Sequence, residues 1–394
     1  MRECFLIDAI RTPRGRLSRP KKNFVGELAN VHPTTLGAIL ADAIVDRNPG
    51  LPSEKIEDLI YATTIAVKEQ AQDIARWIVL ASKLPVTVSG VHLNRFCSGA
   101  LQANAFANAS IRVGDYDAVL AGGGEHMNRV PMGSDRNDPD RLPITPEIRK
   151  KYCIVPQGVS AELIAEKYNI SQDEINAFSV DSQKKAHAAT EAGKFKNEII
   201  PIPYMDAHGE QKVLDRDTHI NPETTIEKVN ALPRPFKENG LIHAAASSGI
   251  CDGASMALWV SEDIARRYNL KPRARVVSVA NWGVDPKEML DGVIPGTQLA
   301  LKRAGLKLDQ IDRFEINEAF ASVPLAWMKT LNVSKEKVNV NGGAIAMGHP
   351  LGSTGGILLA TLINELEREN LRYGLITLCA AQGMSGTMII ERIQ

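Results

Sequence analysis

The sequence is poor in aromatic residues, has no long apolar run and carries no excess charge of either sign. Only 5% of its 394 residues are aromatic, while 30 are glycine; this balance favours closely packed helices and strands over an aromatic-rich β-sandwich. No apolar stretch approaches the roughly 20 residues that span a bilayer. Basic and acidic residues number 46 each, so the formal net charge is zero. That balance argues against general electrostatic binding to nucleic acid or to an anionic membrane.

The cysteines also lack a pattern. The chain has five, at positions 4, 97, 153, 251 and 379, and no two of them form C-x-x-C. An odd number without that spacing argues against a disulfide framework and against structural zinc. The signatures G-x-x-x-x-G-K-[ST], strand-linked G-x-G-x-x-G, H-E-x-x-H and G-x-S-x-G are missing too. With no signal segment before the first predicted strand, we expect a cytoplasmic protein without a metal site.

Short β-branched strands alternate with longer helical segments along the chain. The first half contains predicted strands 3–10, 56–63, 86–93 and 116–121 and helices 34–47, 70–83 and 98–112. The second half contains predicted strands 273–281, 311–316, 337–341 and 373–379 and helices 295–304, 319–331 and 352–368. Such alternation indicates βαβ units and a largely parallel sheet covered on both faces, that is, an α/β fold.

The two halves resemble each other. Three pairs of strand-like segments are similar: 56–61 and 311–316, 115–121 and 372–379, 253–260 and 385–392. Internal similarity of this kind predicts two related layered halves stacked about a pseudo-twofold axis.

A different stretch, residues 122–245, interrupts the first half. It is richer in charge and proline and has helical patterns near 157–168 and 172–192. An insertion of this length on an α/β scaffold is typical of a lid or substrate-binding region.

Cys97 is the first candidate site residue. It lies in N-R-F-C-S-G-A at 94–100, where a predicted strand ends and a helix of small residues begins. A thiol at a helix N-terminus meets unsatisfied N–H groups and the positive end of the helix dipole, which lower its pKa. The alternative interpretation is a buried and inert cysteine.

His349 is the second candidate. It lies in the glycine-rich segment N-G-G-A-I-A-M-G-H-P-L-G-S-T-G-G at 341–356, again between a predicted strand and a helix. It therefore occupies in the second half the place that Cys97 occupies in the first. If the halves stack about a twofold axis, the two loops meet and form a nucleophile–base pair. The alternative is a structural histidine.

Two more strand ends carry candidate residues. Cys379 ends a strand in L-C-A-A-Q-G-M-S-G at 378–386, where the other loops are expected to meet. Asn317 and Glu318 begin N-E-A-F-A at 317–321. Amide and acidic side chains at such a junction are also ordinary helix caps.

Taken together, these segments resemble the motifs of the thiolase family, the acyl-CoA acetyltransferases. D-A-I-R-T-P at 8–13, A-G-G-G-E-H-M-N at 121–128 and G-V-D-P at 283–286 extend the resemblance over nearly the whole chain. It implies a duplicated thiolase-like fold, with two βαβαβαββ halves in a five-layer α-β-α-β-α arrangement and an inserted loop domain. The expected boundaries are 1–121 plus 246–270 for the N-terminal half, 122–245 for the inserted CoA- and substrate-binding domain, and 271–394 for the C-terminal half.

The resemblance also implies a role for each candidate residue. Cys97 accepts the acyl group, and His349 activates Cys97 and later the thiol of CoA. Cys379 exchanges a proton with the α-carbon of acetyl-CoA. Asn317 holds a water that forms one oxyanion hole with His349, while the backbone N–H groups of Cys97 and Ala381 form the other. The residues expected along the pantetheine channel are Ser248, Met289, Phe320 and Phe236.

The implied reaction is the reversible, CoA-dependent thiolytic cleavage of 3-oxoacyl-CoA to acyl-CoA and acetyl-CoA, in fatty-acid or related acyl-CoA degradation. It proceeds by a ping-pong mechanism through an acyl-cysteine, with CoA as co-substrate, no bound cofactor and no metal. Family members are dimers or dimers of dimers, so a homodimer or homotetramer is expected. The alternatives are a biosynthetic thiolase that forms acetoacetyl-CoA, a decarboxylating ketoacyl synthase, and a non-catalytic CoA-binding protein. A synthase carries a second histidine where Asn317 stands.

Three departures from the family pattern concern the substrate. Ala381 stands where a glycine is common, and Pro156-Gln157 stands where biosynthetic enzymes tend to have His-Met. An arginine near the CoA phosphates is replaced around Asn221, which leaves as substitutes Lys228, Arg234 and Lys237. The acyl chain that the enzyme accepts is therefore left open by the sequence.

Overall fold

The computed structural model describes residues 2–136 and 143–393. The remaining positions of the three predicted domains, 1, 137–142 and 394, lie outside these ranges. The strands are β1 (Cys4–Arg11), β2 (Gly15–Arg16), β3 (Asp58–Ala62), β4 (Val91–Leu93), β5 (Ala118–Glu125), β6 (Ile202–Met205), β7 (Gln211–Leu214), β8 (Cys251–Ser261), β9 (Ala274–Gly283), β10 (Arg313–Ile316), β11 (Tyr373–Ala380) and β12 (Met384–Arg392). The helices are α1 (Pro33–Arg47), α2 (Ile74–Ala81), α3 (Gly99–Val113), α4 (Pro146–Lys151), α5 (Gln157–Lys167), α6 (Gln172–Glu191), α7 (Ile226–Asn230), α8 (Glu262–Arg267), α9 (Val293–Ala304), α10 (Ser322–Leu331), α11 (Ala344–Met347) and α12 (Thr354–Arg368).

The strand order confirms the duplication. The sheet runs β10-β11-β12-β9-β1-β8-β5-β3-β4, and β2 pairs with β8 beside this path. Each half therefore has the same arrangement, with its first strand, β1 or β9, at the centre and its last, β8 or β12, next to it. The halves join where Leu6 of β1 pairs with Ala274 of β9. The three pairs of similar segments fall on β3 and β10, β5 and β11, and β8 and β12.

The expectation of a largely parallel sheet is wrong. Parallel pairing links β3 to β4 and β5, and β10 to β11, but β8 and β12 run antiparallel to both of their neighbours. In the second half the reason is the connection: only a short turn separates the end of β11 from the start of β12. A turn of that length joins antiparallel strands, because a parallel pair needs a long crossover.

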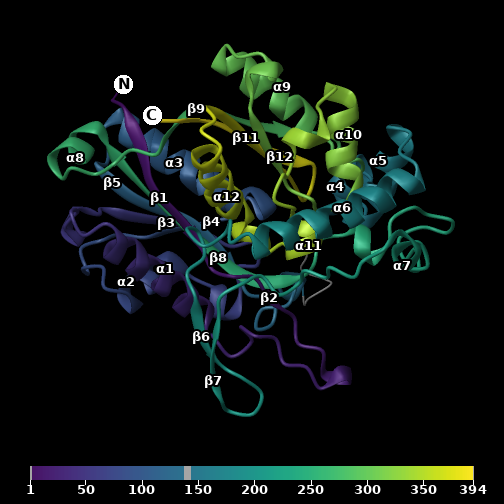
Figure 1. Ribbon diagram of the computed structural model, residues 1–394, viewed down its shortest axis with the longest axis horizontal. Coiled ribbons are helices and arrows are strands. Elements are labelled where there is room, and N and C mark those ends of the chain that lie inside the picture. The colour runs from purple at the N-terminus through teal and green to yellow at the C-terminus, as the bar shows by residue number, and fades with distance from the viewer. Residues whose placement is uncertain (1, 137–142, 394) are drawn as a thin grey trace.

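The helices form three layers around the strands. Helix α3 packs on β3, β5 and β8 and also contacts β12, while α12 packs on β11 and β10 and also contacts β1 and β8. These two helices contact each other and form the middle layer, visible between the two groups of strands in Figure 1. Helices α1 and α2 cover the first half on its outer side, and α9 covers the second. The layer order is thus α-β-α-β-α, as predicted.

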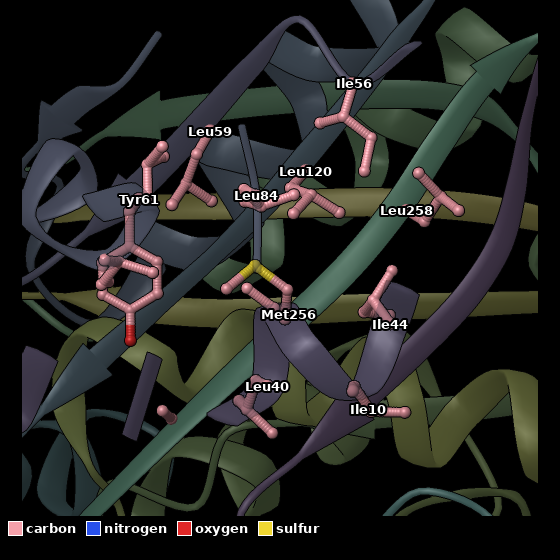
Figure 2. Close-up of a cluster of buried hydrophobic side chains, with 14 of the residues drawn as sticks. Ile10, Leu40, Ile44, Ile56, Leu59, Tyr61, Leu84, Leu120, Met256 and Leu258 are labelled. Carbon is pink, nitrogen blue, oxygen red and sulfur yellow. The ribbon is translucent and has the colours of Figure 1, made fainter. Parts of the chain in front are cut away.

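The outer core of the first half shows why these segments pack as they do. Leu40 and Ile44 of α1 lie one helical turn apart and face Leu120 of β5 and Leu258 of β8 (Figure 2). All four are fully buried. Residues four apart on a helix share a face, so α1 presents an apolar stripe to the alternate side chains of the strands.

Two predicted strands differ from the structure. Of residues 86–93, only β4 is extended, and it lies at the edge of the sheet. Residues 337–341 form no strand apart from a single bridge between Phe314 and Val338. There Asn339 takes a φ of 44° and its side chain bonds the backbone of Ile316 at both N–H and C=O. The Asn339 side chain thus makes the two hydrogen bonds that the backbone of a neighbouring strand would make. The local sequence pattern does not reveal this substitution.

The segment between β5 and β8 leaves the layered body. It carries α4 to α7 and the β6–β7 hairpin. Helices α5 and α6 fall where the sequence predicts helices, and α6 begins with a capping box formed by Ser171 and Glu174. Helix α5 packs on α10 and α6 on α11, so these two helices cover the second half, whereas Ile202 of β6 and Leu214 of β7 join the core of the first half. Its limits as a separate domain stay a prediction.

Candidate active site

Cys97 lies in a short 3₁₀ turn, Phe96–Ser98, that leads from β4 into α3. The residue before it, Phe96, has a φ of 47°, a left-handed conformation that non-glycine residues rarely adopt. Cys97 itself is 4% exposed and packs with Met127, Leu351 and Ala380. The second and third of these follow His349 and Cys379 closely in sequence, so the thiol lies where the three loops meet.

His349 lies in the equivalent place of the second half, between α11 and the 3₁₀ turn Leu351–Ser353 that leads into α12. Its backbone N–H donates to the Gly249 carbonyl at 2.8 Å. In the side chain, Nδ1 lies 2.6 Å from the Thr354 hydroxyl and Nε2 lies 3.3 Å from the amide nitrogen of Asn317. Both ring nitrogens are thus held, and the residue is 4% exposed.

These contacts select one tautomer of the imidazole. The Thr354 hydroxyl donates to the Pro350 carbonyl at 3.4 Å, so its oxygen accepts from Nδ1–H of His349. We infer that the proton sits on Nδ1 and that Nε2 carries the lone pair. The hydrogen bond at one ring nitrogen commonly sets the role of the other. In this tautomer Nε2 is able to act as a base.

Cys379 is at the end of β11, directly before the turn to β12. In that turn, the backbone N–H of Ala381 is close enough to lower the pKa of the Cys97 thiol, and Cys379 is close enough to raise it electrostatically. The Ser98 hydroxyl donates to the Leu378 carbonyl at 3.4 Å. The nucleophile loop of one half is therefore bonded to the strand end of the other.

Glu125 connects the segment that follows β3 to the loop that follows His349. It is 1% exposed and accepts hydrogen bonds from the backbone N–H groups of Thr64, Ile65 and Gly352. Gln70 donates to it as well, at 2.7 Å. A buried carboxylate with this many donors holds its surroundings in one arrangement. It binds the first half to the residues just after His349.

Burial keeps all three candidate groups neutral. It raises the pKa of the Cys97 thiol far above its usual value, and the neighbouring Cys379 and Glu125 raise it further. Burial also raises the pKa of Cys379 to about 12. For His349, burial and then the positive charge of Arg14 lower the pKa to about 3. The resting site therefore contains two thiols and an unprotonated imidazole.

The predicted lowering of the Cys97 pKa is therefore wrong for the resting protein. The N–H groups of Cys97 and Ala381 do act in the expected direction. Removal of the thiolate from water opposes them and is the larger effect. The sequence shows the helix start but not the depth at which the turn lies.

Asn317 and Glu318 are not helix caps. Helix α10 begins only at Ser322, and no side chain caps it. Asn317 faces His349, and its Oδ1 is buried without a hydrogen-bond partner among the described residues. Glu318 accepts from the hydroxyl of Ser182, the amide of Asn339 and the backbone of Ile345. The first residue faces the site, and the second supports the loop that leads to it.

The predicted pantetheine contacts lie close together. Met289 and Phe320 belong to the same buried cluster as Cys379, and Phe236 packs against that cluster. The rings of Phe236 and Phe320 meet edge to face, with 5.9 Å between their centroids. The backbone N–H of Ser248 donates to the Ala319 carbonyl at 3.0 Å, beside the Asn317 loop.

The basic residues suggested for the CoA phosphates already have partners. Lys237 forms an ion pair with Glu166, and Lys228 donates to the Glu223 carbonyl at 2.8 Å. Arg234 donates to Gln172 and to nearby backbone carbonyls. Their role toward CoA stays a prediction.

The described part of the chain contains no candidate metal cluster and no candidate membrane-spanning helix. No group of three or more His, Cys, Asp or Glu side chains there has an arrangement that could hold a metal ion. Nor is any described helix both long and apolar enough to cross a membrane.

Sequence reasoning missed two residues of the site, Thr354 and Arg14. Thr354 lies within the glycine-rich segment five positions after His349, and that spacing is the only signal in the sequence for a contact. Arg14 directly follows D-A-I-R-T-P, but nothing in the sequence indicates that its side chain is buried beside the His349 loop.

Comparison with known proteins agrees with this geometry. The model of the thiolase N-terminal domain matches residues 4–263 and that of the thiolase C-terminal domain matches residues 270–392. A 3-ketoacyl-CoA thiolase of Serratia proteamaculans is 40% identical over 100% of both chains. The 3-oxoadipyl-CoA/3-oxo-5,6-dehydrosuberyl-CoA thiolase of Escherichia coli is 37% identical over 100% of both. The crystal structure of the Bacillus anthracis acetyl-CoA acetyltransferase superimposes with a TM-score of 0.89 at 32% identity, covering 100% of this chain and 99% of that one.

A duplicated α/β fold in which a cysteine and a histidine from equivalent loops meet at a second cysteine defines an acyltransferase. The chain belongs to the thiolase family.

Proposed function

We propose that the protein catalyses the reversible, CoA-dependent thiolytic cleavage of 3-oxoacyl-CoA to acyl-CoA and acetyl-CoA through a covalent acyl-cysteine. The observation that carries this proposal is the convergence of Cys97, the Cys379 strand end and the His349 loop. Relatives of nearly 40% identity over their full length are named 3-ketoacyl-CoA thiolases. CoA serves as co-substrate, and the chemistry needs no bound cofactor.

The first half-reaction breaks a carbon–carbon bond. As the sulfur of Cys97 attacks C3 of the substrate, its proton passes to Nε2 of His349. A concerted transfer suits this site because neither group is ionised at rest. The bond between C2 and C3 then breaks, and the acyl group remains on Cys97. The departing enolate of acetyl-CoA takes its proton from Cys379.

Two oxyanion sites lower the barriers of these steps. The N–H groups of Cys97 and Ala381 both act on the Cys97 sulfur, and after acylation the carbonyl oxygen on the adjacent acyl carbon is the group they would bind. The unpartnered oxygen of Asn317 is available to hold a water that, together with His349, binds the enolate oxygen. Loss of one such donor typically costs about 10²–10³ in rate.

The second half-reaction transfers the acyl group to CoA. The proton on His349 restores the Cys379 thiol, and the freed imidazole takes the proton of the CoA thiol. The CoA sulfur attacks the acyl-cysteine, and Cys97 leaves with the proton that His349 returns. Each proton is thus accounted for, and the same groups serve both directions of the reaction.

The finer assignments form part of the same proposal. We assign residues 122–245 to CoA and substrate binding, with the pantetheine arm along Ser248, Met289, Phe320 and Phe236. We also propose that the protein is a cytoplasmic homodimer or homotetramer that functions in acyl-CoA degradation. The cluster of three of these residues with Cys379 supports the channel.

A series of 3-oxoacyl-CoA substrates tests this function. Purified protein should cleave them in the presence of CoA with ping-pong kinetics, and mass spectrometry of quenched protein should find the acyl group on Cys97. Acyl transfer without Cys97 modification, or no cleavage of any chain length, contradicts the proposal.

A second candidate is the biosynthetic formation of acetoacetyl-CoA, favoured by the similarity to the Bacillus anthracis acetyl-CoA acetyltransferase. The same series separates the two. A biosynthetic enzyme should prefer acetoacetyl-CoA over every longer substrate, whereas a degradative one should accept longer chains.

A further inference from the structure

Arg14 is a buried cation directly beside the His349 loop. It lies in the turn between β1 and β2 and is 3% exposed. Its Nη1 donates to the Gly348 carbonyl at 3.1 Å, and its Nη2 lies 3.8 Å from the Met347 sulfur. Both contacts are with the two residues that precede His349. The proposed chemistry assigns this side chain no role.

A charge cluster connects Arg14 to the inserted segment. Asp217 accepts from the backbone N–H of Arg14 at 2.8 Å, and its Oδ1 lies 3.4 Å from Nε of Arg14. Arg11 forms two hydrogen bonds with the same carboxylate, at 2.9 and 3.1 Å, and a third with Glu198 at 2.7 Å. The cluster therefore joins the end of β1 to the inserted segment.

The hydrogen bonds of Arg14 indicate that this side chain contributes little to the stability of the fold. Asp217 is already paired bidentately with Arg11, which is the strong geometry for a guanidinium and a carboxylate. Arg14 Nε, by contrast, has no hydrogen bond to any described residue. Burying an incompletely paired charge is costly, and apolar side chains often stabilise such a position better. Its side-chain hydrogen bond to a main-chain oxygen reaches the His349 loop instead.

The loop that carries His349 needs support at this point. Gly348 has a φ of 96°, and a Cβ there would lie 2.6 Å from the Cys251 sulfur and 3.2 Å from His219. The backbone thus turns sharply in a confined space just before the imidazole. After His349, the chain is held by the Thr354 hydroxyl and by the bond from Gly352 to Glu125. Arg14 holds the other side.

We propose that Arg14 is a positioning residue for the reaction of Cys97. Its guanidinium fixes the Gly348 carbonyl and so holds the backbone that carries the His349 imidazole, and it ties this loop to the inserted segment through Asp217. Its positive charge also keeps the imidazole unprotonated. This inference rests on the proposed function only in its choice of acetyl-CoA as the acyl donor. The contacts of Arg14 with the His349 loop do not depend on that function.

The charge acts among several other titratable groups. Those that surround the loop are the thiols of Cys97, Cys379 and Cys251, the imidazole of His219, and the carboxyls of Glu125 and Asp217. Arg14 is the one whose charge acts directly on His349.

The test compares Arg14→Met, Arg14→Lys and the control Arg273→Met. Arg273 is also ion-paired and mostly buried, but its partners are Asp8 and Glu367, and it does not contact the residues of the candidate site. Rapid quenching with acetyl-CoA gives the maximal rate of Cys97 acetylation and the half-saturating concentration. Iodoacetamide labelling of Cys97 between about pH 2.5 and pH 8, a range that includes the low pKa of His349, gives a second rate that needs no acyl-CoA.

For Arg14→Met we expect both maximal rates to fall about 10- to 100-fold, because a small misplacement of a catalytic group has that effect. The half-saturating concentration should change by less than about twofold, since Arg14 is not expected to touch substrate. The acidic limb of the labelling profile should move to higher pH, because removing a nearby positive charge favours the imidazolium. Arg14→Lys keeps the positive charge, so the acidic limb of its labelling profile should stay at the wild-type pH. Its two maximal rates should lie between those of Arg14→Met and the wild type.

Rates of Arg14→Met within about twofold of the wild type, or a loss matched by Arg273→Met, overturn the inference. If Arg14→Met does not fold, Arg14→Lys decides: an unchanged rate refutes the positioning role, and a reduced rate with an unmoved pH limb supports it. Wild-type protein that cleaves no 3-oxoacyl-CoA refutes the proposed function instead. In that case the iodoacetamide labelling rates of Cys97 still test the positioning role of Arg14, because they do not depend on acyl-CoA.

Discussion

Replacing Thr354 by valine tests the tautomer of His349. Valine has nearly the same shape as threonine but lacks the hydroxyl that lies 2.6 Å from Nδ1 of the imidazole. In Thr354→Val, the Nδ1–H group is left buried without an acceptor. The tautomer with the proton on Nε2 loses only the hydroxyl as a donor to its Nδ1 lone pair, and its Nε2–H can use the unpartnered amide oxygen of Asn317.

The magnitude follows from the cost of the lost hydrogen bond. Leaving a buried donor unsatisfied costs about 1–3 kcal/mol. That penalty falls mainly on the reactive tautomer, so the ratio of the reactive to the unreactive tautomer drops by a factor of about 5 to 150. Because the Cys97 thiol requires a free Nε2, we expect its acetylation rate to fall by up to that factor.

Thr297→Val is the matched control. The Thr297 hydroxyl accepts from the indole N–H of Trp327 at 2.9 Å, and both residues are fully buried in the outer layer of the second half. The same atoms are removed there, with a similar expected loss of stability but no contact with the site. Thermal unfolding and single-turnover acetylation are measured for both variants. Acetylation at the wild-type rate in Thr354→Val, or equal losses in the two variants, refutes the reasoning.

Other predictions concern the thiols and pH. Iodoacetamide should inactivate the protein in step with labelling of Cys97, with acyl-CoA protecting it, whatever the rate at which the exposed Cys153 is labelled; inactivation in step with Cys153 instead contradicts this. Cys379→Ser should nearly abolish carbon–carbon cleavage, by about 10²–10⁴, while leaving measurable acyl exchange on Cys97; equal loss of both activities removes the separate acid/base role. Because the pKa of His349 is lowered to about 3, the imidazole stays neutral on acidification, and acetylation should persist well below pH 6.5 in a stopped-flow titration. Ala381→Gly should raise the rates for branched acyl groups relative to acetoacetyl-CoA while keeping the N–H donor; an unchanged ratio shows that the methyl group does not shape the acyl pocket.

The sequence predicted that the segments carrying Cys97, His349 and Cys379 meet, but it did not predict the ionisation of these side chains. Cys97 follows β4 and Cys379 lies at the end of β11, and strand ends are recognisable from composition, while His349 is marked by its glycine-rich loop rather than by a strand. Their pKa values depend on how much of the protein surrounds them, and burial is a property of the whole molecule. The sequence therefore predicted correctly that a helix starts next to Cys97, but the pKa of the thiol is raised and not lowered as predicted.

Contacts between distant segments were the least predictable. Arg14 and Gly348 are far apart in the chain, as are Glu125 and Gly352, and nothing local marks either pair. The strand order was also out of reach, because β8 returns after a long insertion to lie between β1 and β5. Local patterns show which segments are strands but not which neighbours they choose.

The amino-acid sequence by itself determined the family and the duplicated α/β fold and named the candidate reactive side chains, since these depend on residue types in fixed local order. Tertiary structure alone decided which protonation states those side chains have, which tautomer the imidazole takes, and which buried charges support it. The physical reason is that desolvation and hydrogen bonding act through space, between atoms that only the folded chain brings together.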